Sequence, residues 1–125
     1  MNTPLTASLA ALSMLVACAS PYAASPTKTQ MDVLTNPAGM TLYEFDKDVA
    51  GSGKSACNGE CAQKWPPFTV SASDKASGDY AVITRDDGAL QWSYKGKPLY
   101  RWSKDQKPGD MTGDGVNNVW HTAKP

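Results

Sequence analysis

Two cysteines set four residues apart carry the clearest chemical potential in the chain. Cys57 and Cys61 lie in the stretch SACNGECAQKW. On a regular helix such residues have Cα atoms about 6 Å apart, within the range that a disulfide tolerates. We expect a structural disulfide, since the N-terminus discussed below indicates export to an oxidising compartment. A bridge over so short a loop stabilises a fold weakly, so a thiol redox or metal-handling role stays open as the alternative. The metal site would need His121, with Met111 or Met40, as further ligands.

A second segment resembles the start of a calcium-binding loop. Asp110, Thr112 and Asp114 would supply oxygen atoms at positions 1, 3 and 5, and Gly115 stands at position 6. Position 12 falls on His121, where a bidentate carboxylate would be required. We therefore expect a glycine-rich turn here and no bound cofactor, with calcium binding by these three residues as the alternative.

Catalytic patterns are weak in this sequence. It lacks a G-x-S-x-G nucleophile motif, and its single histidine, His121, has no neighbour in the sequence that marks it as a base. Lys and Arg total 12 and Asp and Glu total 12, which leaves no excess positive charge for nucleic acid. The expectation is a protein that is not an enzyme and that does not bind nucleic acid.

A ten-residue pattern occurs twice and indicates duplication of a β unit. Residues 39–48 and 96–105 both read G-x-x-L-Y-x-[FW]-x-K-D. Their aromatic residues stand two apart, so on a strand both rings of a copy share one face while the preceding leucine points to the other. We expect the rings to be core rather than a platform for a sugar or peptide, and the aspartates to cap turns. The motif residues are Tyr43, Phe45 and Asp48 in the first copy and Tyr100, Trp102 and Asp105 in the second.

The elements around these residues are short strands joined by turns. Alternating patterns and Gly- or Pro-containing turns predict strands over 31–35, 40–45, 80–85, 89–94, 97–102 and 119–122. Residues 55–64 are helix-like, with Ser55 as the expected N-cap and Pro66-Pro67 as the stop. A chain of 125 residues leaves room for one such domain. The prediction is a mostly β protein: a small antiparallel β domain of two related halves with one short helix.

The N-terminus predicts export and lipid attachment. Residues 5–19 form an uncharged apolar run of signal-peptide length that contains Leu15-Val16-Ala17-Cys18, a sequence similar to the bacterial lipobox. We expect a signal peptide over 1–17, a lipidated N-terminus at Cys18 with a tether over 18–29, and a folded domain over 30–125. Ordinary cleavage after Ala19 is the alternative. With lipidation, the chain is exported and its partner is the membrane, at the outer membrane or in the periplasm.

The two motif copies, the cysteine stretch and the late Gly113-Asp114-Gly115 with Trp120-His121 resemble the bacterial secreted-repeat lipoproteins, described by a Y-x-[FWY]-x-x-D motif. The resemblance spans about residues 31–123. It implies an envelope location and a two-copy architecture, and it implies no substrate. The expected function is a non-enzymatic envelope lipoprotein that binds or spaces an unidentified envelope ligand or protein.

Overall fold

The computed structural model describes residues 25–71 and 74–125, so the expected signal peptide and Cys18 lie outside the described residues. The described residues form seven strands, one α-helix and one 3-10 helix. In chain order these are β1 Lys28–Gln30, β2 Val33–Thr35, β3 Tyr43–Phe45, α1 Glu60–Lys64, β4 Tyr80–Thr84, β5 Leu90–Tyr94, β6 Lys97–Pro98, η1 Val116–Asn118 and β7 Trp120–Thr122. In this part of the chain, no helix has the length and apolar content to cross a membrane.

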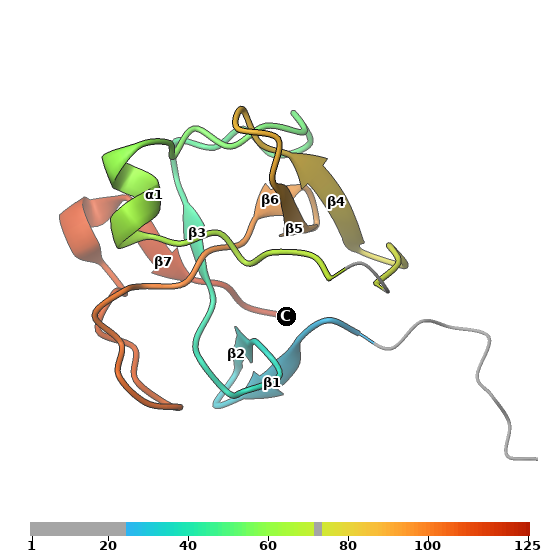
Figure 1. Cartoon of the computed structure of the whole chain (residues 1–125). Coiled ribbons are helices and arrows are strands. Elements are labelled where there is room, and N and C mark those ends of the chain that lie inside the picture. The colour runs from blue at the N-terminus through green and yellow to red at the C-terminus, as the bar shows by residue number, and fades with distance from the viewer. Residues whose placement is uncertain (1–24, 72–73) are drawn as a thin grey trace, which may run out of the picture.

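The strands form three small antiparallel sheets, which confirms the predicted mostly β class (Figure 1). β1 pairs with β2, β3 pairs with β7, and β4, β5 and β6 form the predicted meander. In the meander Val82 lies opposite Trp92, and Tyr80 lies opposite Tyr94. The closing strand expected over 119–122 is β7.

Several element boundaries differ from the prediction. The strands expected over 40–45 and 97–102 are only Tyr43–Phe45 and Lys97–Pro98, because Tyr100 pairs with Tyr43 and Pro67 through isolated bridges and not as part of a ladder. The helix begins at Glu60 after Gly59, not at Ser55, because Gly59 has φ 61° and interrupts the helical backbone. Ser55 Oγ accepts the Cys57 N–H in a local turn and also contacts Tyr100 and Arg85. Met31 is not in a strand: Met31 and Asp32, with φ 51° and 64°, form the turn between β1 and β2. Two-residue turns with positive φ favour Asn-Gly, Asp-Gly or Gly-Gly, and Met31-Asp32 matches none of these pairs, so the turn could not be predicted. β1 begins at Lys28, inside the stretch 18–29 assigned to the tether, since backbone pairing needs no apolar pattern.

Two matching rings of backbone hydrogen bonds interlock the halves of the domain. Each ring joins two segments of one half to the last segment of the other half. In the first, the Leu34 N–H donates to the Ala123 carbonyl, the Ala123 N–H to the Leu42 carbonyl and the Leu42 N–H to the Leu34 carbonyl, at 2.8, 2.9 and 2.9 Å. In the second, Trp92, Phe68 and Leu99 donate in turn to the carbonyls of Phe68, Leu99 and Trp92, each at 2.9 Å. The two halves are therefore related by an approximate two-fold axis and exchange their final segments.

The side chains divide into two core clusters, one on each face of the motif strands. The first cluster is aromatic and consists of Tyr43, Phe45, Cys57, Trp65, Tyr100, Trp102 and Trp120. The second consists of Leu34, Leu42, Trp92, Tyr94, Leu99 and Ala123. Leu42 and Leu99 thus lie in the cluster opposite their neighbouring tyrosines, as the alternation predicts. All four motif rings are buried.

Truncation of Trp102 tests how much the aromatic cluster contributes to the free energy of unfolding. Trp102→Ala is expected to lower the free energy of unfolding by about 3 to 5 kcal/mol, because it removes a buried ring and leaves a cavity. The control is Val49→Ala, since Val49 is 69% exposed and its truncation should change stability by less than about 0.5 kcal/mol. Urea denaturation of both variants measures the difference. Equal midpoints for Trp102→Ala and the wild type would contradict the assignment of this ring to the core.

Candidate functional site

Each motif tyrosine is bonded to the motif aspartate of the other repeat. The Tyr43 hydroxyl donates to Asp105 Oδ2 at 2.6 Å, and the Tyr100 hydroxyl donates to Asp48 Oδ2 at 2.6 Å. The two tyrosine backbones also pair directly: the Tyr43 N–H donates to the Tyr100 carbonyl at 2.8 Å, and the Tyr100 N–H donates to the Tyr43 carbonyl at 2.9 Å. We call this arrangement the tyrosine–aspartate exchange.

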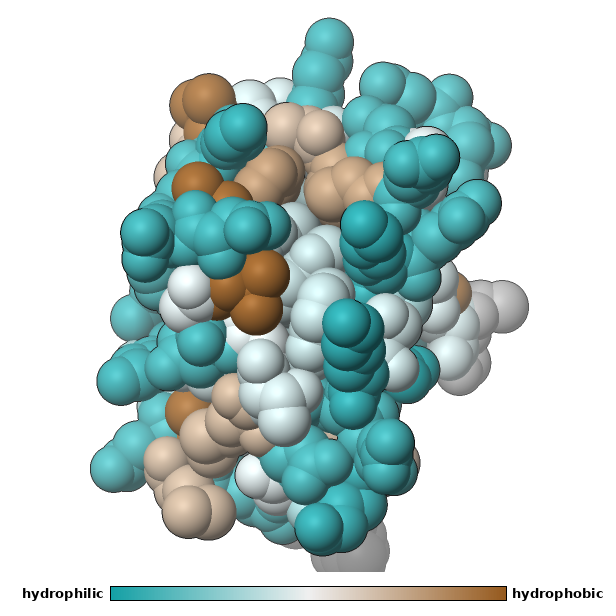
Figure 2. Space-filling model, turned by 90° about the vertical axis from the view of Figure 1, so that its left-hand side faces the viewer, coloured by the Kyte–Doolittle hydropathy of each residue, from teal (hydrophilic) through white to brown (hydrophobic). Residues whose placement is uncertain are grey.

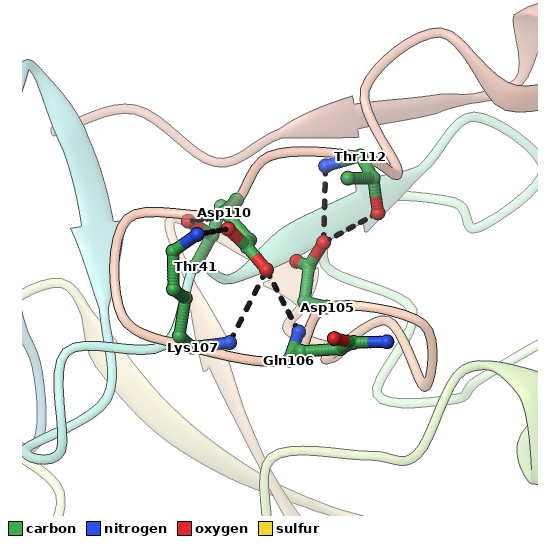
Figure 3. Close-up of polar contacts among 6 residues, drawn as sticks. All are labelled: Thr41, Asp105, Gln106, Lys107, Asp110 and Thr112. Carbon is green, nitrogen blue, oxygen red and sulfur yellow. Dashed lines mark hydrogen bonds and ion pairs between the residues drawn. The ribbon is translucent and has the colours of Figure 1, made fainter.

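The second carboxylate oxygen of each aspartate holds a loop of its own repeat. Asp48 Oδ1 accepts the Ala56 N–H at 2.6 Å. Asp105 Oδ1 accepts the Thr112 N–H at 3.0 Å and the Thr112 hydroxyl at 2.6 Å (Figure 3). The aspartates thus bind backbone N–H groups, as turn-capping residues do, but at Ala56 and Thr112 rather than in the turn next to the motif.

The hydroxyls of the exchange are fully used. Burial and the aspartate hydrogen bond raise the pKa of Tyr43 and of Tyr100 above the usual tyrosine range, so both stay protonated and donate. The Gly113 N–H donates to the Tyr43 hydroxyl at 3.2 Å, and the Ser55 hydroxyl lies 2.6 Å from the Tyr100 hydroxyl. Since each tyrosine hydroxyl is held on both sides inside the core, the arrangement positions the repeats and offers no free acid or base.

A buried arginine extends the network beside Tyr100. Arg85 is 4% exposed and donates to Ser55 Oγ at 3.0 Å, to Gln91 Oε1 at 2.6 Å and to the Cys57 carbonyl. Ser55 therefore accepts from Arg85 and is left to donate to Tyr100. Sequence reasoning missed this role of Arg85, because the strand pattern around residue 85 carries no sign that its side chain turns inward.

The three calcium candidates are not brought together. Asp110 Oδ2 accepts the backbone N–H groups of Gln106 and Lys107, and its Oδ1 lies 3.7 Å from Lys107 Nζ (Figure 3). These backbone hydrogen bonds lower the pKa of Asp110. Thr112 donates to Asp105, and Asp114 Oδ1 accepts the Thr122 N–H at 3.2 Å. Across residues 25–71 and 74–125, no group of three acidic, cysteine or histidine side chains could hold a metal ion.

Cys57 and Cys61 form a disulfide with a Cα–Cα distance of 5.2 Å, as their spacing predicts. Cys57 is fully buried against the aromatic cluster, whereas Cys61 is partly exposed on α1. The bridge therefore ties the end of the 46–59 loop to the start of the helix.

The single histidine lies on the surface of the β3–β7 pair. His121 Nε2 is 2.8 Å from Asp46 Oδ2, and both side chains are about half exposed (49% and 51%). Glu44 lies opposite His121 on β3, and burial raises its pKa. This pairing is long-range, which explains why no sequence-local partner of His121 was found.

Four rings of the aromatic cluster form one continuous stack. Phe45 stacks on Trp120 with ring centroids 4.2 Å apart, Trp120 on Trp65 at 3.7 Å and Trp65 on Trp102 at 3.9 Å. Tyr43 and Tyr100 pack edge-on against Trp65 and Trp120. Along the stack, side chains of the first repeat alternate with side chains of the second. The approximate two-fold axis therefore passes between the two central rings, Trp65 and Trp120.

One edge of the stack forms the floor of a surface groove of about 440 Å³. It is lined by Phe45, Lys47, Cys61, Lys64, Trp65, Asn117, Val119 and Trp120. Figure 2 shows the side of the molecule on which α1 and β7 lie, where a band of pale and brown residues runs between hydrophilic flanks. Sequence reasoning missed this groove. The recurrence of a tryptophan downstream of each motif, Trp65 and Trp120, was the available signal.

Comparison with known proteins identifies the repeats. A family model described as a secreted repeat of unknown function matches residues 27–69 and 81–124. These two matches coincide with the two halves that the hydrogen-bond rings interlock. No curated protein and no solved structure matches the chain.

A double-mutant cycle on Tyr43 and Asp105 tests the exchange. Tyr43→Phe should lower the free energy of unfolding by about 1.5 to 3 kcal/mol, because it leaves a buried carboxylate oxygen without its donor. Tyr94→Phe is the matched control, since Tyr94 is a tyrosine of the other core cluster outside the exchange. Chemical denaturation of Tyr43→Phe, Asp105→Asn and the double variant gives the coupling energy. Additive effects of the two substitutions would contradict a direct interaction.

Proposed function

The chain belongs to the family of secreted repeats of unknown function, and we propose that it is a lipid-anchored, non-enzymatic binding module of the cell envelope. The family is described as secreted, which agrees with the apolar run at residues 5–19. Attachment through Cys18, at the outer membrane or in the periplasm, is the finer part of the proposal and is supported by the Leu15-Val16-Ala17-Cys18 sequence.

The observation that carries a binding role is the groove over the aromatic stack. It is open to solvent, since Lys47, Lys64 and Asn117 on its walls are exposed, and it places aromatic edges next to cationic and amide groups. Concave sites with an apolar floor and a few convergent polar groups are typical of ligand sites. A module that served only as a spacer would have no need of such a site.

The internal polar groups support binding rather than catalysis. The tyrosines and aspartates of the exchange bond one another and backbone groups of the loops, and buried Arg85 bonds Ser55, Gln91 and the Cys57 carbonyl. A general acid or base must be free to exchange a proton with a substrate. Side chains whose polar atoms are already bonded inside the core would stabilise the fold and would not exchange protons with a substrate.

A thiol redox role is the second candidate, because Cys61 lines the groove and is partly exposed. Reduction would need attack on one of the two sulfur atoms, and Cys57 is fully buried. The tie between α1 and the 46–59 loop gives the bridge a structural purpose. We therefore place the redox role behind the binding role.

Lipid anchoring is tested by Cys18→Ser expressed in a bacterium with lipoprotein processing. The variant should move from the membrane fraction to the soluble fraction, because it loses the acyl chains that together hold a protein firmly at a membrane. The control variant Cys57→Ser/Cys61→Ser removes the other two cysteines and should stay with the membrane. Fractionation with immunoblotting measures both. A wild-type protein that is wholly soluble with its N-terminus at Ser20 would overturn the anchor.

A further inference from the structure

We propose that the groove over the aromatic stack binds a small, planar, anionic ligand that contains an aromatic ring. This inference rests on the proposed binding function and names the ligand class of that site. It is carried by the orientation of the floor rings, by the charge of the walls and by the size of the groove.

The floor of the groove presents the edges of rings. Trp65 and Trp120 have both faces covered, since each is stacked between two other rings at centroid distances of 3.7 to 4.2 Å. Both side chains are 3% exposed, so only an edge reaches the groove. The edge of an aromatic ring carries the partial positive charge of its quadrupole, and the face carries the partial negative charge. Such a floor favours the electron-rich face of another ring, or an anionic oxygen.

Ring edges also exclude two common ligand classes. A cation binds over the face of an aromatic ring, where the quadrupole is negative. The apolar face of a sugar likewise needs a ring face to lie on. Because neighbouring rings cover the faces of Trp65 and Trp120, these two tryptophans offer neither kind of contact.

The walls add positive charge. Lys47 and Lys64 are both exposed, and no Asp or Glu lines the groove. In the part of the chain that the structure describes, the ion pairs are Lys107–Asp110 and His121–Asp46, so neither groove lysine is in one. Asn117 contributes an amide that can donate to an anionic oxygen. The charge of the site is therefore complementary to a carboxylate, sulfonate or phosphate group.

The size of the groove sets the scale of the ligand. A volume of about 440 Å³ lies in the range of small-molecule sites, roughly 300 to 1,000 Å³. Val119 and the exposed part of Cys61 provide apolar contact beside the ring edges. A ring of one or two fused cycles with one anionic group fits these features together.

The test uses three probes and the full chain with Cys18→Ser, which leaves the described residues unchanged. Naphthalene-2-sulfonate is the planar aromatic anion, naphthalene-2-sulfonamide its neutral counterpart and cyclohexanesulfonate an anion without an aromatic ring. Nuclear magnetic resonance titration follows the backbone amides of Lys64, Asn117 and Val119, with Asp79, outside the groove, as the reference. The expected result is saturable shifts at the groove amides, with both other probes at least about fivefold weaker.

Lysine variants test whether Lys47 and Lys64 supply the positive charge that binds the anion. Lys47→Gln and Lys64→Gln should each weaken naphthalene-2-sulfonate by up to about fivefold, the value of one exposed ion pair, while Lys124→Gln, an exposed lysine outside the groove, should bind as the parent does. Equal affinity for the sulfonamide, or unchanged affinity in both groove variants, would overturn the ligand class and leave groove binding intact. If none of the three probes gives saturable shifts, the binding role falls together with this inference. The Cys18 experiment is unaffected by either outcome.

Discussion

The tyrosine–aspartate exchange is the interaction on which the rest of the structure depends. A buried carboxylate is costly unless donors satisfy it, and Oδ2 of each motif aspartate accepts the tyrosine hydroxyl of the other repeat. Without the other repeat, this oxygen of each aspartate would lose its donor. The same aspartates accept N–H groups of Ala56 and Thr112, so the loops that cover the core depend on the exchange as well.

The two cycles of backbone hydrogen bonds and the stack of aromatic side chains follow from this reciprocal bonding. Once Tyr43 and Tyr100 pair along their backbones, the rings two residues further on lie on the same side, and Trp65 and Trp120 from the ends of the repeats fill the space between them. The stack then lies in the core, and edges of its rings reach the surface at the groove. The groove is in this sense a consequence of the duplication, because its floor contains rings from both repeats.

Local patterns predicted the parts of this structure that depend on local geometry. The alternation around Tyr43 and Tyr100 predicted both core faces, the glycine turns predicted the meander, and the cysteine spacing predicted the disulfide. The crossing of the hydroxyl bonds could not be predicted, because spacing assigns a residue to a face and says nothing about which repeat lies opposite. The helix start differs from Ser55 for another reason: Ser55 does accept the Cys57 N–H, as a capping residue would, but the positive φ of Gly59 delays the helix to Glu60.

Native-state hydrogen exchange tests the central claim that the two repeats form one cooperative unit. The backbone amides of Tyr43 and Tyr100 bond each other's carbonyls, while Leu34 and Trp92 belong to the two separate hydrogen-bond rings. If the exchange interlocks the repeats, these four amides should all have the same opening free energy, equal to that of global unfolding. They should also show the same dependence on denaturant concentration. Protection of the Trp92 amide that persists while the Leu34 and Tyr43 amides exchange through a smaller opening would contradict the account, because it would show that one repeat stays folded without the other.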